Sequence, residues 1–310
     1  METGGRANPS VDRHTKERRQ LIGGAAAVAL IEFNDFSFKY VGSDSLALKK
    51  VNLSVEAGEY VVVSGPSGCG KTTLCRAING LVPQFHRGYI AGNVFVDSKS
   101  TRENSVADMA GITGLVFQNP SNQLVTLNVE KEIAFGPENL GVDPAEIRKR
   151  VEHLIHLLGL EHLREKHPHE MSGGEQQRVA MAATLALRPK ILVADEPTSN
   201  LDPQSAEMIL ELIAEQNREG MTVVLVEHRL DVVAKDASRL ILMNEGSVVA
   251  DGPPEDVLLM DICQDIGIGI PKAVEVFKRL RSKDLHLPEV PMTGEDLVRI
   301  FREVVEHDSA

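Results

Sequence analysis

The pattern of hydrophobic and polar positions divides the chain into stretches with a strand period and stretches with a helical period. Residues 31–40 and 46–59 place apolar side chains at alternate positions, which predicts antiparallel strands. Residues 60–64 (YVVVS) form an uninterrupted apolar run rich in valine, typical of a parallel strand buried on both faces. A helix should follow from Lys71 to about Leu81.

A helical pattern occupies the chain between residues 117 and 171. Asp143, Pro144 and Glu146 supply a cap, a first-turn proline and an acid, the signals that mark the start of a helix. Apolar residues then recur at helical spacing until Gly159, which favours a stop. We therefore expect a helical subdomain inserted into an α/β core.

Buried strands return after this region. Apolar runs at 190–194 and 221–226 flank a predicted helix at 203–218, and this alternation indicates a mainly parallel sheet. Two further helices are predicted, one near 272–283 and an amphipathic one that opens at Thr293. The predicted parts are a disordered leader (1–30), a main domain (31–260) with its helical subdomain at about 119–187, and a helical C-terminal appendage (261–310).

Composition narrows the class of protein. The chain has 310 residues, 42% apolar and 25% charged, as in ordinary globular proteins. Its net charge of -12 argues against nucleic acid as a partner. Cys69, Cys75 and Cys263 show neither disulfide nor zinc spacing, which suits a reducing compartment.

A glycine-rich loop carries the first chemical signal. Residues 65–73 read GPSGCGKTT, a complete match to the GxxxxGK[ST] phosphate-loop pattern between a strand and a helix. Backbone N–H groups of such a loop point at phosphate oxygens, while Lys71 should neutralise phosphate and the Thr72 hydroxyl should bind Mg²⁺. The predicted nucleotide-binding residues of the loop are Gly65, Pro66, Ser67, Gly68, Cys69, Gly70, Lys71, Thr72 and Thr73. Taken alone, the loop indicates only a nucleotide.

Two acids follow a buried strand. Asp195 and Glu196 come directly after the apolar run ILVA, which places them at the ligand-binding edge of an open parallel sheet. Asp195 would bind Mg²⁺, and Glu196 would polarise the attacking water as a general base. The alternative is a pair of solvated acids at a strand end, which the phosphate loop on the same chain makes less attractive.

These residues, together with MSGGEQQR at 171–178, resemble the ATP-binding-cassette ATPases over roughly residues 31 to 259. The resemblance implies ATP hydrolysis and a P-loop NTPase core with an antiparallel β subdomain and an inserted α-helical subdomain. It also implies site residues. Tyr40 would stack on adenine, unless it is a plain strand residue; Gln118 would touch Mg²⁺ or the water and serve in catalysis with Lys71. His228, one of ten histidines, would contact the γ-phosphate.

The MSGGEQQR segment implies that two chains work together. In the family, Ser172, Gly173, Gly174 and Glu175 begin a helix that meets the γ-phosphate held by the opposite subunit. Residues 199–202 (SNLD) match the loop that crosses the dimer interface. Without the phosphate loop, SGGE would be read as a serine-capped helix start with no ligand. Met171 stands where leucine is usual and Glu175 where glutamine is frequent, which bears on the strength of dimer closure.

Two shorter segments indicate a subfamily. FQNPSNQL at 117–124 and VEHRLD at 226–231 are similar to segments in the ATPases of energy-coupling-factor transporters, which import vitamins or cobalt and nickel. The implied partners are a second ATPase subunit, a transmembrane coupling subunit and a substrate-binding membrane subunit. Rival interpretations are the ATPase of an amino-acid or lipoprotein importer and a soluble ATPase of macromolecular assembly or repair.

The beginning of the chain bears on location. Residues 21–31 are apolar, but eleven residues fall short of the roughly 20 that a transmembrane helix needs. Preceding basic residues give this stretch some likeness to a signal peptide, with a mobile tail as the alternative. We favour the tail, since an exported ATPase would lack ATP, and expect a peripheral protein on the cytoplasmic face of the cell membrane.

Overall fold

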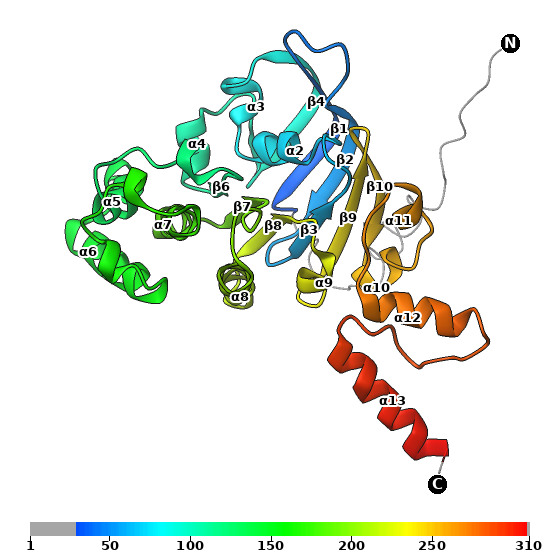
Figure 1. The fold of residues 1–310 in the computed structure, drawn as a ribbon. Coiled ribbons are helices and arrows are strands. Elements are labelled where there is room, and N and C mark those ends of the chain that lie inside the picture. The colour runs from blue at the N-terminus through cyan, green and yellow to red at the C-terminus, as the bar shows by residue number, and fades with distance from the viewer. Residues whose placement is uncertain (1–28, 309–310) are drawn as a thin grey trace, which may run out of the picture.

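The computed structural model describes residues 29–308 (Figure 1). Residues 1–28 of the predicted leader (1–30), and with them most of the apolar stretch at 21–31, lie outside the described residues. Within the described part, no helix combines the length and the apolar character needed to cross a bilayer.

Two β-sheets form the centre of the molecule (Figure 1). The antiparallel sheet contains β1 (Ile31–Tyr40), β2 (Leu48–Val55), β4 (Gly88–Val96) and β5 (Lys99–Ser100), in the order β2-β1-β4-β5. The second sheet contains β3 (Tyr60–Ser64), β6 (Thr113–Val116), β7 (Ile191–Asp195), β8 (Thr222–Val226), β9 (Arg239–Asn244) and β10 (Ser247–Gly252), in the order β10-β9-β3-β8-β7-β6. Its strands pair in parallel except for β10. The predicted mainly parallel sheet is thus present.

Side chains of the parallel sheet alternate between two cores. In β3, Val61 and Val63 pack with the antiparallel sheet, whereas Tyr60 and Val62 pack with the helices of the opposite face. In each of the strands β3, β7 and β8, all five residues are buried. Burial on both faces explains why these strands are almost uniformly apolar in sequence.

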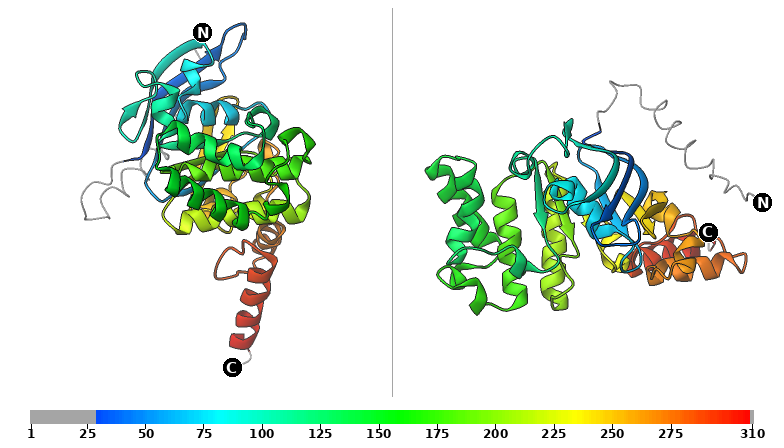
Figure 2. Two further views of the ribbon diagram at one scale, coloured as in Figure 1. Left: turned by 90° about the vertical axis from the view of Figure 1, so that its left-hand side faces the viewer. Right: turned by 90° about the horizontal axis from the view of Figure 1, so that it is seen from above.

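Helices cover the sheets and extend to both sides (Figures 1 and 2). They are α2 (Lys71–Ile78), α3 (Leu81–Gln84), α4 (Val106–Ala110), α5 (Val129–Asn139), α6 (Pro144–Leu157), α7 (Gly173–Ala186), α8 (Pro203–Arg218), α9 (Leu230–Val233), α10 (Pro254–Val257), α11 (Ile262–Asp265), α12 (Lys272–Arg281) and α13 (Gly294–Asp308), with 3₁₀ turns η1 (Pro120–Asn122), η2 (Glu161–Leu163) and η3 (Pro168–Glu170). Helix α2 ends three residues before the predicted Leu81, because Gly80 adopts a left-handed conformation with φ of +73°.

Helices α5, α6 and α7 lie together beyond the β6 edge of the parallel sheet (Figure 1). Helix α6 starts as predicted: the Asp143 carboxylate accepts hydrogen bonds from the N–H groups of Ala145 and Glu146, and Pro144 follows the cap. At the opposite side, α12 contacts α13, which extends away from the sheets (Figure 2).

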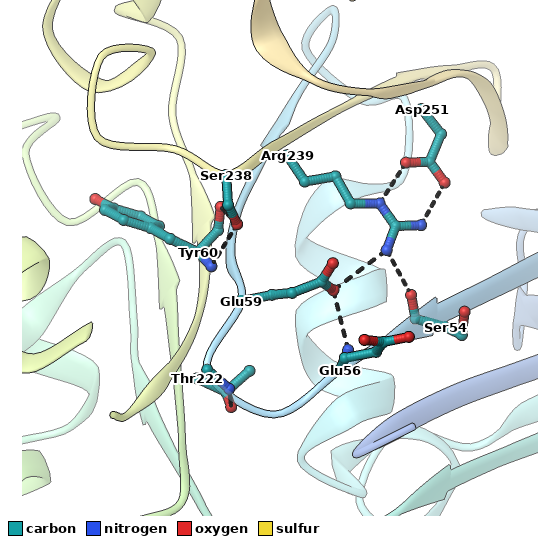
Figure 3. A network of polar contacts seen from close by, with 9 residues as sticks. Ser54, Glu56, Glu59, Tyr60, Thr222, Ser238, Arg239 and Asp251 are labelled. Atoms are coloured by element: carbon teal, nitrogen blue, oxygen red, sulfur yellow. Dashed lines mark hydrogen bonds and ion pairs between the residues drawn. The ribbon is translucent and has the colours of Figure 1, made fainter. Parts of the chain in front are cut away.

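A half-buried arginine at the start of β9 joins the ends of several strands (Figure 3). The Arg239 guanidinium pairs bidentately with Asp251 at 2.6 and 2.7 Å. It also donates to Glu59 at 3.2 Å and to the carbonyl of Ser54 at 2.8 Å. These bonds connect β9 with β10, with β2 and with the turn before β3. The network therefore stabilises the end of the sheet opposite the phosphate loop.

Candidate functional site

The phosphate loop lies between β3 and α2, and two of its glycines have no room for a side chain. At Gly65 (φ of +154°) an added Cβ would lie 2.2 Å from the Met243 carbonyl oxygen. At Gly70 (φ of +113°) it would lie 2.4 Å from the carbonyl oxygen of Ala47. Both positions thus require glycine for conformation and for close backbone packing. The predicted strand, loop and helix context is present.

Lys71 is held inside this loop. Its side chain is buried, with a residue exposure of 5%. The ammonium group donates to the Gly65 carbonyl at 2.8 Å and to the Pro66 carbonyl at 3.1 Å. The loop therefore fixes a positive charge among its own backbone groups, where a phosphate would meet both the ammonium and the N–H groups of the α2 start.

Asp195 is the last residue of β7 and is 4% exposed. Burial raises the pKa of its carboxyl group, the neighbouring Glu196 adds to the rise, and a hydrogen bond from Thr72 opposes it. The Oδ1 atom is buried without a hydrogen-bond partner among the described residues. An unpaired buried carboxylate oxygen beside a threonine hydroxyl suits a hard cation, because such oxygens are the usual ligands of Mg²⁺.

Glu196 joins two residues that are distant in sequence. Its Oε2 atom accepts a hydrogen bond from Gln118 Nε2 at 2.7 Å, and its Oε1 atom lies 2.9 Å from His228 Nε2. Gln118 follows β6 and His228 follows β8, the strands on either side of β7. The sheet order thus gathers three predicted site residues at one edge.

The backbone of Glu196 is in a conformation that non-glycine residues seldom adopt. Its φ is +49°, and its N–H group donates to the Val226 carbonyl at 3.1 Å. Left-handed backbone of this kind costs about 1 kcal/mol and is common at functional sites. The turn directs the Glu196 side chain to the edge where Gln118 and His228 lie.

Tyr40 ends β1 beside the helix that follows the phosphate loop. Its hydroxyl lies 3.2 Å from Thr73 Oγ1 and accepts a hydrogen bond from Arg76 at 3.1 Å. The ring is partly exposed and meets the His86 ring edge to face, with centroids 6.0 Å apart. The aromatic residue thus lies at the α2 side of the loop, and the prediction that it stacks on a base stays a prediction.

The SGGE segment lies at the start of α7 and is built separately from the loop. Ser172 is the N-cap: its hydroxyl donates to Glu175 Oε2 at 2.8 Å and accepts from the N–H group of Glu175 at 3.3 Å. The Ser172 N–H group donates to the same carboxylate at 2.7 Å, and these bonds lower the pKa of Glu175. Ser172 and Gly173 are exposed, so this helix start faces outward.

The SNLD segment connects the carboxylate pair with α8. Asp202 caps α8 by accepting from the Gln204 and Ser205 N–H groups. Hydrogen bonding by the Ser205 side chain, followed by the Ser205 N–H group, lowers the pKa of Asp202. Ser199 and Asn200 are exposed. The segment therefore has an end fixed by Asp202 and an exposed part at Ser199 and Asn200.

Two features of the site were not assigned from sequence. Ser121, three residues after Gln118, donates to Gln176 of α7 at 2.8 Å. This bond connects the segment after Gln118 with the helix that begins at SGGE. Glu227, before His228, is a buried carboxylate with a hydrogen bond from Thr198. An acid placed between the apolar run VVLV and a histidine is the sequence signal that could have identified Glu227.

Comparison with known proteins gives a consistent result. A family model described as ABC transporter matches residues 48–199. The chain is 43% identical over 258 residues to an ABC transporter ATP-binding protein of Pyrococcus abyssi, covering 83% of the chain and 92% of the relative. It is 38% identical to an energy-coupling factor transporter ATP-binding protein of Caldanaerobacter subterraneus, covering 88% of the chain and 98% of the relative. Some relatives are longer: the chain spans 43% of an ABC transporter ATP-binding protein of Methanosarcina mazei, 44% identical over 81% of the chain.

Solved structures share the fold. The cbiO1 protein of Clostridium perfringens, part of the ABC transporter complex cbiONQ, superposes with a TM-score of 0.65 and 29% identity, covering 82% of this chain and 99% of that one. A dimeric ATP-binding cassette in a post-hydrolysis state, bound to ADP and Pi, superposes with a TM-score of 0.64 and 30% identity, covering 72% and 98%.

Proposed function

Because the chain belongs to the ABC transporter family of ATP-hydrolysing cassettes, we propose that it powers an energy-coupling-factor importer for a vitamin or for cobalt or nickel. The observation that carries this proposal is the 38% identity over 98% of the Caldanaerobacter subterraneus energy-coupling factor protein. The likeness to cbiO1, a part of the cbiONQ transporter complex, gives further support.

The site supports specific roles in ATP hydrolysis. Lys71 and the loop N–H groups bind the β- and γ-phosphates, since both lie at the start of α2. Glu196 takes a proton from the attacking water as general base. Gln118 and His228 hold its carboxylate from two sides, at 2.7 and 2.9 Å, and so orient the base. A carboxylate only accepts, so the proton of a neutral His228 lies on Nε2.

Mg²⁺ fits the residues beside the loop. The unpaired Oδ1 of Asp195 and the Thr72 hydroxyl would hold it together with Gln118. When bound, the ion would neutralise phosphate charge. The raised pKa of Asp195 is consistent with this role, because a buried carboxylate kept without a cation is unfavourable.

We propose that two such subunits close around ATP. The start of α7 exposes Ser172 and Gly173, and a helix N-terminus with free N–H groups is suited to phosphate. ATP held by Lys71 of one subunit would meet Ser172 of the other, with Tyr40 against the base. The dimeric post-hydrolysis cassette with ADP and Pi supports this arrangement.

The segment after Gln118 offers a surface for a membrane partner. Val125 and Leu127 are 69% and 62% exposed. The buried carboxylate of Glu132 accepts from the N–H groups of Val125 and Thr126 at 3.0 and 2.7 Å, which fixes the segment. An ordered apolar segment joined to Gln118 could pass movement of the site to a transmembrane coupling subunit. This docking would place the protein on the cytoplasmic face of the membrane.

Recovery of the tagged chain from solubilised membranes tests the proposal. We expect it to bring down a polytopic coupling subunit and a substrate-binding membrane subunit. Leu127→Asp should reduce this recovery at least tenfold, because a charge at an interface core is costly. Val41→Asp is the matched control, since Val41 is 80% exposed in the loop between β1 and β2. Recovery of the wild type without any polytopic protein would contradict the proposal.

A further inference from the structure

We infer that Glu227 is a positioning residue for ATP hydrolysis, which fixes His228 and the loop of Glu196 relative to one another. Glu227 is 4% exposed and directly follows β8. One carboxylate oxygen, Oε1, accepts from the N–H groups of His228 and Arg229 at 2.9 and 3.2 Å. The other, Oε2, accepts from the Thr198 hydroxyl at 2.5 Å. The inference rests on the proposed roles of Glu196 and His228.

The contacts of Glu227 reach two loops and one strand at the functional edge. Thr198 lies two residues after Glu196, in a turn where the Ser199 N–H group donates to the Glu196 carbonyl at 3.2 Å. The N–H group of Glu227 donates to the Val63 carbonyl at 3.2 Å, in the strand that leads into the phosphate loop. A single buried residue thus connects β3 with the loops after β7 and β8.

The hydrogen bonds of Glu227 restrain both partners of the Glu196–His228 contact. Two N–H bonds set the direction in which the backbone of His228 leaves β8, and the Thr198 bond anchors the turn of Glu196. The His228 side chain is 40% exposed, so packing encloses its ring only in part. Glu227 does not touch the site of hydrolysis itself. Its effect is therefore on how accurately the reacting groups are placed, which governs turnover more than ATP affinity.

The test is steady-state ATP hydrolysis by the full chain, with ATP affinity and melting temperature measured alongside. Glu227→Ala should lower kcat about tenfold while KM for ATP changes less than about twofold, because a displaced base costs rate and leaves binding intact. Glu227→Gln should stay within about threefold of wild type, since its amide can accept from backbone N–H and face the Thr198 hydroxyl. Thr198→Val, which keeps shape and loses the hydroxyl, should lower kcat about threefold.

Asp251→Ala is the control for stability alone. It breaks the Arg239 network at the opposite end of the sheet (Figure 3), so the melting temperature should fall while kcat stays unchanged. The inference is wrong if Glu227→Ala and Thr198→Val keep the wild-type kcat, or if they lose only stability as Asp251→Ala does. His228→Ala separates the two proposals: wild-type turnover in that variant refutes the role of His228. If His228→Ala loses turnover while Glu227→Ala and Thr198→Val keep it, only the role of Glu227 is refuted.

Discussion

The two glycine-rich segments of the molecule, the phosphate loop and the SGGE start of α7, are built in opposite ways. At the loop, Lys71 and Asp195 are 5% and 4% exposed, and side chains arrive from several strands. At the start of α7, Ser172 is exposed and its hydroxyl is bonded to Glu175, one turn away in the same helix. The loop is a finished binding surface inside one chain. The start of α7, by contrast, is exposed at Ser172 and Gly173 and makes its side-chain hydrogen bonds within its own first turn.

The largest expected effect separates chemistry from binding at the loop. Glu196→Gln should lower kcat about a thousandfold, because it removes the general base while keeping size and the bond to His228. ATP binding should persist, and the protein should run as a dimer in gel filtration with ATP. Glu245→Gln, an exposed control with 82% of its side chain accessible, should keep full turnover. Undiminished hydrolysis in Glu196→Gln would refute the assignment of the base.

Mixing two inactive variants tests whether the two segments meet across a dimer. Lys71→Ala and Ser172→Arg should each lose about a hundredfold in turnover, since each removes phosphate stabilisation from the site. A one-to-one mixture should recover up to about a quarter of wild-type turnover, because half of the dimers are mixed and each of those has one intact site. Mixed dimers isolated with two different tags that remain inactive would contradict the shared site.

A smaller effect concerns the loss of folding stability caused by burying the Asp195 carboxylate. Burial raises the pKa of Asp195 in the folded protein, so its ionisation makes folding less favourable as pH rises above the ordinary value of 3.8. Asp195→Asn should therefore stabilise the nucleotide-free protein by about 1 kcal/mol at pH 7 while weakening hydrolysis. Thermal unfolding of both proteins in EDTA measures this gain in stability. The gain should vanish below pH 3.8, where the carboxyl is protonated in both states; a gain that persists there would contradict this explanation.

The smallest effect is expected at the exposed segment. Glu175→Gln keeps a side chain that can cap Ser172, so stability should change by less than about 0.5 kcal/mol. Turnover should change less than about threefold, which chemical unfolding and steady-state kinetics can check. Glu175→Ala serves as the contrast, because it removes the capping box and should cost about 1 kcal/mol. Equal behaviour of the two variants would show that the cap is unimportant.

Much of the local structure could be predicted because its signals are local. The loop at 65–73, the Asp143 cap of α6 and the apolar runs of β7 and β8 each contain their own pattern. The short strand β5 and the strands β4, β9 and β10 were not identified. In β4, Gly92 has a φ of +73° beside a register shift against β1, which interrupts the alternation that would have indicated a strand.

The geometry of the site depends on information that is not local. Glu196 was selected from its place after a buried strand, and Gln118 and His228 from the family resemblance, but their contacts follow from the strand order β8-β7-β6. The contacts of Glu227 with Thr198 likewise join residues 29 positions apart. Such contacts depend on strand pairing, which a residue pattern within one segment does not specify.

The close approach of Gly70 to Ala47 has a mechanical consequence. The Lys49 N–H group donates to the Gly246 carbonyl at 2.7 Å, and the Gly246 N–H group donates to the Cys69 carbonyl at 2.8 Å. With no side chain between loop and strand, the antiparallel sheet and the phosphate loop form one stiff block. A displacement of the phosphate loop should therefore move the antiparallel sheet with it. If the molecule bends during ATP hydrolysis, we expect it to bend at the connections to helices α5, α6 and α7.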